Sequence, residues 1–366
     1  MSREFVPFCD TVIHRYANRW QLPSHGVMDK RLLHGQITVT ITARTPIMVS
    51  DGSRVKEGPI LAALFSRDAQ GRYRIPGSTL RGLIRQNMQI LGLGALTIDR
   101  GEDISPDKVY GGAMPWNGMP GSHSALLADD PRDDPEFHDR GRKTYVTEYR
   151  GTLDYPRSIM GFVMREYQPR NKPRTLCYRS RISVGDLTAL GAPRELSTVP
   201  VNQTLPRQSD PDFIQNLGKG RFRLSGFRQY PPMTVRSEPW DSRQGIRPLD
   251  AGTRFTGVIR YRNLHSDELG LLLWCLRLEE GCVHAMGMAK GYGYGQVSIS
   301  IDALTEFDPS TLYGSLTATG TPAADTAARV EQLIQTYRRF AANPGFAGRD
   351  PAVMPHIRTF LDLHRP

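Results

Sequence analysis

Residues 74–91 constrain the fold of this chain more than any other stretch of its sequence. They read Arg-Ile-Pro-Gly-Ser-Thr-Leu-Arg-Gly-Leu-Ile-Arg-Gln-Asn-Met-Gln-Ile-Leu. A short apolar segment ends at a Pro-Gly turn, and Ser78 or Thr79 is placed to cap a helix. Leucine, isoleucine and methionine side chains then recur at helical spacing on one face. The stretch therefore predicts a short strand, a turn and a capped amphipathic helix.

The opposite face of this predicted helix carries Arg81 and Arg85, four residues apart. A helix N-terminus offers free backbone N–H groups and the positive end of the helix dipole. Two arginines close to that end favour a phosphate ligand, with Gly77 and Ser78 at the turn. An ordinary capped helix with solvated arginines has the same pattern, so both interpretations stay open at this point.

The composition favours a polyanionic partner. The chain has 366 residues, a formal net charge of +10 and a pI of about 9.6. Its basic residues concentrate in two turn-rich regions, residues 165–181 and 219–247, where tyrosines and phenylalanines are interleaved. This pattern suits a phosphate backbone with some stacked bases. The sequence has no run of about 18 apolar residues and no signal peptide, so we expect a cytoplasmic protein with no membrane partner.

The order of the predicted elements indicates the fold class. Residues 36–49 alternate apolar and polar side chains as a strand does, and the helix of residues 77–91 follows. Three more strands are expected at residues 179–184, 253–261 and 294–301. A second helix is expected at residues 266–276, between the last two of these strands. This is the split βαβ pattern of a ferredoxin-like, RNA-recognition-type sheet. We therefore expect an α+β fold.

Two irregular regions interrupt this pattern, at about residues 97–150 and 189–250, and we interpret both as large insertions. Residues 1–313 are therefore expected to form one decorated domain. Residues 314–326 are small and polar, as in a linker, and a helix with an apolar face follows. We expect residues 314–366 to form a linker and a C-terminal helical tail that docks on this protein or on a neighbour.

A glycine-rich loop precedes the last predicted strand and reads Met286-Gly-Met-Ala-Lys-Gly-Tyr-Gly-Tyr-Gly-Gln-Val297. Glycine lets the backbone approach a phosphate, lysine adds positive charge and tyrosine adds a stacking surface. The loop lacks Gly-Lys-Ser/Thr and leads into a strand, which excludes a Walker loop and a dinucleotide fingerprint. A simple hairpin remains the alternative to RNA binding. The residues that we expect to bind RNA are Lys290, Gly291, Tyr292, Gly293 and Tyr294.

Three motifs in this order resemble the RAMP superfamily, in particular the backbone subunits of type III CRISPR effector complexes. Ile75–Arg85 resembles the Ile-Pro-Gly-Ser helix start of the family, and Met286–Val297 lies where the family has its glycine-rich loop. Met160-Gly-Phe162, followed by Arg179-Ser-Arg-Ile-Ser-Val-Gly-Asp186, resembles the Phe-Gly turn and Arg-x-Arg strand of the family. The resemblance covers about residues 5–303, and the order and spacing of the motifs carry most of it.

The resemblance implies a guide-RNA-binding subunit of a CRISPR ribonucleoprotein. Its partners would be guide RNA, single-stranded target RNA and other effector subunits, and Arg179 and Arg181 join the RNA-binding residues. In several members of the family, an acidic residue after the first strand cleaves target RNA with a divalent metal. Asp51 and Glu57 are the catalytic candidates here, with Mg²⁺ or Mn²⁺, although neither stands in the Ile-Asp-x-Pro segment of the family. Either can equally be a solvated loop acid, so endoribonuclease activity stays open.

Two other function classes fit parts of the sequence. A stand-alone RAMP endoribonuclease that processes precursor CRISPR RNA needs a general acid and base, often histidine, and the nine histidines show no clear pair. A nucleotide-binding protein would use the glycine-rich loop, but a recognisable acidic partner is missing. Cys275, Cys282 and His284 invite a zinc site. However, Cys275 lies in an apolar run, where a buried free thiol is the expected state.

Overall fold

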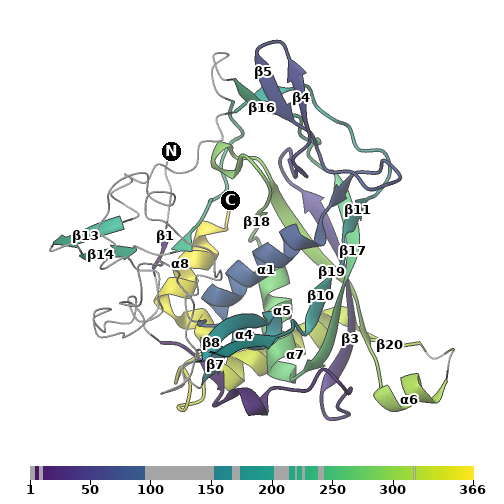
Figure 1. Ribbon diagram of the computed structural model, residues 1–366, viewed down its shortest axis with the longest axis vertical. Coiled ribbons are helices and arrows are strands. Elements are labelled where there is room, and N and C mark those ends of the chain that lie inside the picture. Colours follow the sequence, from purple (N-terminus) through teal and green to yellow (C-terminus); the bar gives the residue numbers. More distant parts are fainter. Residues whose placement is uncertain are drawn as a thin grey trace.

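The fold is built around one large sheet in the computed structural model, which describes residues 5–7, 11–94, 152–166, 174–201, 214–218, 221–224, 227–237, 243–315, 317 and 319–366. The strands of the sheet are β3 (Leu33–Ala43), β6 (Arg74–Ile75), β10 (Ile182–Val184), β11 (Leu187–Ala189), β17 (Arg254–Leu264), β18 (His284–Ala285), β19 (Gln296–Glu306) and β20 (Thr321–Pro322). Their order is β18-β19-β3-β17-β11-β6, with β10 paired to β17 and β20 paired to β19 (Figure 1).

The connections between these strands confirm the expected ferredoxin-like topology. Helix α1 (Gly77–Leu91) lies between β3 and β10 in the chain, and helix α5 (Ser266–Arg277) lies between β17 and β19. In space, β3 is the inner strand that pairs antiparallel with both β17 and β19, while β10 pairs with the outer side of β17. The spatial order is thus fourth, first, third, second, which is the split βαβ arrangement. The fold is α+β, as predicted.

The alternation of buried and less buried side chains along β3 shows which face of the sheet packs on the core. Ile37, Val39 and Ile41 are fully buried on the face that the two helices cover, while the threonines between them point to the other face. Leu80 and Ile84 of α1 are also fully buried and belong to the same hydrophobic cluster. The apolar periodicity of both elements therefore builds one contiguous core beneath the sheet.

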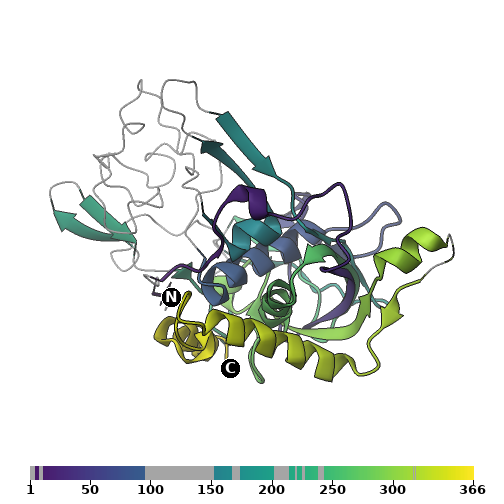
Figure 2. The same ribbon diagram turned by 90° about the horizontal axis from the view of Figure 1, so that it is seen from below.

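Helix α5 is buried on nearly every side because the C-terminal helix α7 (Thr326–Ala341) packs against it (Figure 2). A Cβ added at Gly270 would lie 2.0 Å from the carbonyl oxygen of Leu333, so this close helix contact needs glycine. Tyr337 also donates a hydrogen bond of 2.6 Å to the carbonyl oxygen of Leu91 at the end of α1. The C-terminal helices thus dock on the core of this chain, while the division at residue 313 stays a prediction. The remaining helices of this part are α6 (Pro309–Gly314), η5 (Pro351–Val353) and α8 (Pro355–Leu363).

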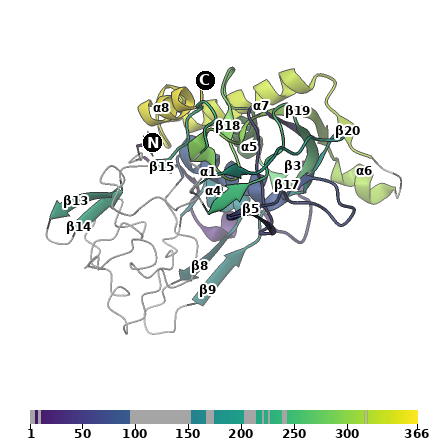
Figure 3. The same cartoon turned by 90° about the horizontal axis from the view of Figure 1, so that it is seen from above.

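Smaller sheets surround the core, and two hairpins project from it (Figure 3). The small four-stranded sheet has the order β12-β16-β5-β4, and the projecting hairpins are β8–β9 and β13–β14. The bounds of the remaining elements are β1 (Phe5–Val6), β2 (His14–Tyr16), η1 (Arg19–Gln21), β4 (Arg54–Glu57), β5 (Ile60–Ala63), β7 (Leu153–Asp154), α4 (Tyr155–Met160), β8 (Phe162–Glu166), β9 (Arg174–Tyr178), β12 (Val199–Pro200), β13 (Ile214–Gly218), β14 (Arg221–Leu224), β15 (Phe227–Arg228), β16 (Gln244–Ile246) and η4 (Lys290–Tyr292).

The structure also bears on the expected insertions, on the Cys275 thiol and on membrane-spanning helices. The expected insertion at residues 97–150 lies outside the described residues, whereas the described parts of 189–250 contribute β12, β16 and the β13–β14 hairpin. Cys275 is fully buried and free, as its apolar surroundings predict. In the described part of the chain, each helix is too short or too polar to cross a bilayer.

Candidate nucleic-acid interface

The N-terminus of α1 is closed by a carboxylate from another part of the sheet. The backbone N–H of Gly77 donates a hydrogen bond of 2.8 Å to Oδ1 of Asp186, which lies between β10 and β11. A Cβ at Gly77 would lie 2.3 Å from the carbonyl oxygen of Val184, so only glycine permits this approach. The prediction that Ser78 or Thr79 caps the helix is wrong. The helix begins at Gly77 itself, and Asp186 supplies the acceptor that a capping side chain would otherwise provide.

Arg81 and Arg85 follow one and two turns later on the half-buried face of α1. Arg81 donates a hydrogen bond of 2.8 Å from Nη2 to the carbonyl oxygen of Met160, at the end of α4. Burial, together with the positive charge of Arg81, lowers the pKa of Arg85. Arg85 nevertheless stays charged, because guanidinium groups in proteins do not lose their proton near neutral pH. The two guanidiniums therefore repel each other, and an anion between them would relieve the repulsion.

A third guanidinium, that of Arg157, acts electrostatically on Arg85 from helix α4. Asp154 caps α4 by accepting a hydrogen bond of 3.0 Å from the backbone N–H of Arg157, and its other oxygen lies 3.8 Å from Nη1. Asp154 and Arg157 were not identified as functional residues from the sequence. An aspartate followed by Tyr-Pro is a usual helix start, and that signal could have located α4. Among the described residues, Arg85 thus has two further guanidiniums and one carboxylate acting on it.

The Phe-Gly turn and the Arg-x-Arg strand lie side by side next to Arg81. Gly161 adopts a φ of +79°, and a Cβ there would lie 2.5 Å from the carbonyl oxygen of Tyr178. The backbone N–H of Arg181 donates 2.9 Å to the carbonyl oxygen of Ile159. Arg179 remains exposed beside this contact. The fold therefore brings Arg81, Arg85 and Arg179, which come from separate motifs, to one region of the surface.

Arg181 has a different environment from Arg179, although the sequence assigned both to RNA. Its side chain is 1% exposed and forms a two-pronged ion pair with Glu268 of α5, whose side chain is fully buried. It also donates to the carbonyl oxygens of Ser158 (2.8 Å) and Asn263 (2.6 Å). Contact of this guanidinium with RNA therefore has no support here. Its donors are used inside the protein to fasten β10 and α4 to α5.

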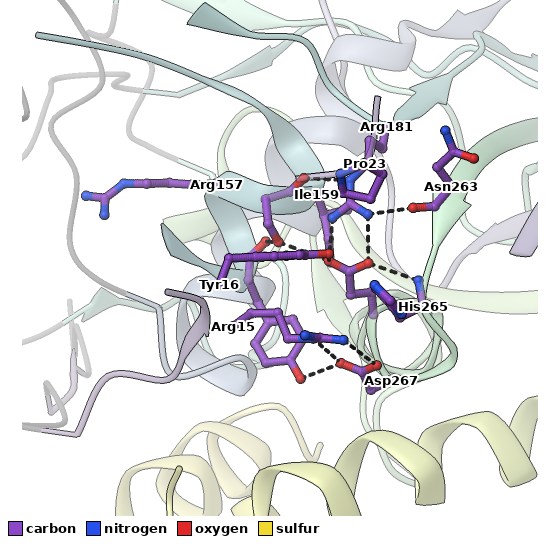
Figure 4. A network of polar contacts seen from close by, with 12 residues as sticks. Arg15, Tyr16, Pro23, Arg157, Ile159, Arg181, Asn263, His265 and Asp267 are labelled. Atoms are coloured by element: carbon purple, nitrogen blue, oxygen red, sulfur yellow. Dashed lines mark hydrogen bonds and ion pairs between the residues drawn. The ribbon is translucent and has the colours of Figure 1, made fainter. Parts of the chain in front are cut away.

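This ion pair belongs to a buried polar network between α4 and α5, beneath the surface that carries Arg81 (Figure 4). Tyr16 donates 3.0 Å to the Glu268 carboxylate, and the Arg181 charge holds the pKa of Glu268 at about 2 against the cost of burial. Next to it, Arg15 and Tyr155 both donate 2.7 Å to Asp267. These bonds fix α4, whose last carbonyl anchors Arg81, against the core.

The glycine-rich loop is packed inside the protein. The side chains of Tyr292 and Tyr294 are 7% and 4% exposed, so neither offers an open ring for a base to stack on. A Cβ at Gly293 would lie 2.7 Å from the carbonyl oxygen of Met233, and Gly291 beside it is half-buried. These glycines thus allow residues 230–236 to cover the loop. The burial of the two tyrosines was not apparent in the sequence, because burial of a loop leaves no periodic signal, and their contact with RNA stays a prediction.

Lys290 is also half-buried at this place, since its Nζ lies 3.2 Å from the carbonyl oxygen of Gly287 and 5.3 Å from the ring centre of Tyr230. A chain of backbone hydrogen bonds joins the loop to the strand that leads into α1, across two intervening segments. Met288 donates to Met48, Ser66 donates to Val49 and Arg74 donates to Ser66, over 2.8, 2.8 and 3.0 Å.

The two acidic candidates lie near this end of the sheet without forming a metal site. Asp51 is exposed, and its Oδ1 accepts a hydrogen bond of 3.0 Å from the backbone N–H of Ser53, which lowers the pKa of its carboxyl. Glu57 on β4 lies 3.4 Å from the guanidinium of Arg247. In the described residues, no three His, Cys, Asp or Glu side chains group together as a metal centre. One free carboxylate does not fit a divalent cation by itself.

Comparison with known proteins gives one clear match. The family model described as the RAMP superfamily matches residues 40–298 of the chain. No curated protein matches the chain. A chain of a solved structure titled "Type IV-B CRISPR Complex" is similar, with 15% sequence identity and a TM-score of 0.30, over 81% of this chain and 98% of that chain.

Proposed function

Because the chain belongs to the RAMP superfamily, we propose that it is a guide-RNA-binding subunit of a type III-like CRISPR ribonucleoprotein. The observation that carries the proposal is the group of guanidiniums along the half-buried side of α1. Among the described residues, Arg81, Arg85 and the largely buried Arg157 share this region with the carboxylate of Asp154. Arg179 is exposed on the neighbouring strand connection. Guanidiniums gathered in this way bind phosphates, and they position a nucleic-acid backbone without reading its sequence.

The test removes charge from α1 and compares it with charge removed elsewhere. We expect Arg81→Ala with Arg85→Ala to weaken binding of a labelled single-stranded RNA by about 2–3 kcal/mol, the range for hydrogen bonds to charged groups. The matched control is Arg339→Ala with Arg358→Ala, two exposed arginines on α7 and α8. Equal affinity of the α1 variant and the control, with both folded by circular dichroism, would reject the proposal.

Precursor processing by the chain alone is the alternative function. Metal-free RNA cleavage needs a histidine, or a similar group, that is accessible and titrates near neutral pH. Burial lowers the pKa of His284 and of His356 to about 4, so neither suits that role. Incubation of the purified chain with precursor CRISPR RNA separates the two functions. A backbone subunit should leave the precursor intact and co-purify with other effector subunits.

Cleavage of target RNA is a further part of the proposal, with Asp51 as first candidate and Glu57 as second. The described side chains do not assemble a metal site, so Mg²⁺ or Mn²⁺ would have to be held largely by the RNA phosphate. Asp51 is exposed and forms no ion pair with a described residue, whereas Glu57 is paired with Arg247. Target cleavage by the assembled complex should therefore stop in chelator and in Asp51→Ala, while guide binding is retained. Cleavage that survives both treatments rejects this assignment.

A further inference from the structure

In the described part of the chain, the helices α1 and α5 pack against one face of the central sheet and the opposite face, the open face, carries no helix (Figure 1). On β17, Phe255 and Ile259 are fully buried toward the helices, so the alternate residues Arg254, Thr256, Val258 and Arg260 point to the open face. Arg254 and Arg260 are exposed there. The strand register places Arg254 opposite Thr42 and Arg260 opposite Gln36.

The open face carries more positive than negative charge. Neither Arg254 nor Arg260 forms an ion pair with a residue that the structure describes. Arg44 at the end of β3 adds a third exposed guanidinium, held by a hydrogen bond of 3.0 Å from Nε to the hydroxyl of Ser298. The nearby acid is Asp302, whose carboxylate already accepts hydrogen bonds from Thr40 (2.6 Å) and from a β19 serine (2.8 Å).

Between the arginines, small hydroxyl side chains lie in register across three strands, next to Val258. Thr40 of β3 lies opposite Thr256 of β17 on one side and opposite Ser300 of β19 on the other. RNA-recognition sheets stack bases on aromatic rings of their central strands, and the described residues of β3 and β17 place none on this face. The described residues of these two strands therefore offer no aromatic ring for a base to stack on, and the exposed arginines favour contacts to phosphates.

We propose that this face is a second RNA-binding surface, on which Arg254 and Arg260 bind the phosphate backbone of a single strand. The inference rests on the proposed RNA-binding function, but it concerns residues on the face of the sheet opposite to α1. Six residues separate the two arginines on one strand, or about 20 Å, so they contact different phosphates. The hydroxyls of Thr40, Thr256 and Ser300 donate within the sheet, so the phosphate contacts come from the arginines. The cores of protein interfaces are poor in serine and rich in aromatics. The composition of this face thus favours RNA over a protein partner.

Salt dependence of binding tests this surface in the full chain. The probe is a labelled 30-nucleotide polyuridine, with affinity measured between about 50 and 200 mM salt. Each phosphate contact on a single strand contributes about 0.7 to the slope of log affinity against log salt. Arg254→Ala with Arg260→Ala should therefore lower the slope by about 1.4, which makes wild type lose about 7-fold more affinity than the variant across this range. Arg339→Ala with Arg358→Ala is the control of equal charge and should keep the wild-type slope.

The outcomes separate this inference from the proposed function. An open-face variant with the slope of the control overturns the inference, whatever the Arg81 and Arg85 variant does. If the Arg81 and Arg85 variant keeps full affinity while the open-face variant loses slope, the α1 site fails and the open face stands. If the open-face variant keeps its slope but no longer assembles with another effector subunit in size-exclusion chromatography, the face binds protein, and the inference is overturned.

Discussion

The backbone N–H of Gly77 donates a 2.8 Å hydrogen bond to the carboxylate of Asp186, which joins the start of α1 to the turn between β10 and β11. The same carboxylate pairs with the guanidinium of Arg74 on β6. A negative charge at this position occupies the positive end of the helix dipole. A phosphate that approaches α1 therefore meets Asp186 at the first turn and the positive charges of Arg81 and Arg85 further along.

We expect Gly77→Ala to destabilise the protein by about 1–3 kcal/mol, the usual cost of an overpacked contact. The reason is that the added Cβ would lie 2.3 Å from the Val184 carbonyl oxygen and 2.8 Å from that of Gly185. Gly82→Ala on the same helix is the control, because nothing lies within 4 Å of its Cβ position. That control should stabilise the helix by about 0.5–1 kcal/mol. Urea denaturation of both variants measures the difference, and equal effects would contradict the packing argument.

The sequence predicted the fold because the signals involved are local and periodic. In the structure, each apolar pattern is a buried face. The alternating residues on β3 are Ile37, Val39 and Ile41, and those at helical spacing on α1 include Leu80 and Ile84. The order of strands and helices then restricts the sheet to very few topologies. The sequence predicted that the C-terminal helical tail docks either on this protein or on a neighbour. In the structure, α7 packs against α5 of the same chain.

The candidate site was less predictable, because burial of a polar side chain depends on partners that are distant in sequence. Arg179 and Arg181 are two residues apart, yet one is exposed and the other pairs with Glu268, 87 residues away. The tyrosines of the glycine-rich loop are buried by residues 230–236, which carry no periodic pattern. Only the three-dimensional arrangement separates a core arginine or tyrosine from one that can contact RNA.

Asp186→Asn should raise the affinity for single-stranded RNA about 2- to 5-fold. Asparagine keeps an oxygen acceptor for the Gly77 N–H group, but it removes the negative charge that faces an incoming phosphate, an effect of about 0.3–1 kcal/mol near a helix end. Fluorescence anisotropy at low salt gives the affinity. Asp362→Asn, an exposed carboxylate on α8 with its own arginine partner, controls for the change in net charge. An unchanged or weaker affinity for the Asp186 variant alone would show that no phosphate approaches the start of α1.

Glu268→Gln should cost about 3–5 kcal/mol at pH 7, because it leaves the buried charge of Arg181 without a partner. The pKa of Glu268 is lowered from 4.5 to about 2, so its ionised form stabilises the folded state fully above pH 4.5. This contribution is lost as the pH falls from 4.5 toward 2. The difference in unfolding free energy between wild type and variant should therefore shrink over that window. A difference that stays constant with pH would mean that the pair is not ionised in the folded protein.

His284 should make the protein less stable in mild acid. Its Nε2 donates to the carbonyl oxygen of Leu276 at 2.8 Å and its Nδ1 accepts from Asn87 at 3.3 Å, an arrangement that only the neutral ring allows. Burial lowers its pKa from 6.5 to about 4, so the unfolded chain binds a proton that the folded chain excludes. Stability is then lost as the pH falls from 6.5 to 4, by up to about 1.4 kcal/mol per pH unit. His284→Gln should flatten this decline in thermal unfolding, and an unaltered pH profile would refute the assignment.

Tyr294 distinguishes a packing role from a stacking role for the glycine-rich loop. If its ring is part of the core, as its 4% exposure indicates, Tyr294→Ala should destabilise the protein by about 3–5 kcal/mol. Tyr294→Phe keeps the ring and should change stability by less than about 1 kcal/mol. In a packing role both folded variants bind RNA as wild type does, because no base contacts the ring. A stacking ring would instead cost about 1–3 kcal/mol of RNA affinity in the alanine variant. RNA titration at a temperature where the alanine variant is fully folded, checked by near-UV circular dichroism, decides between the two roles.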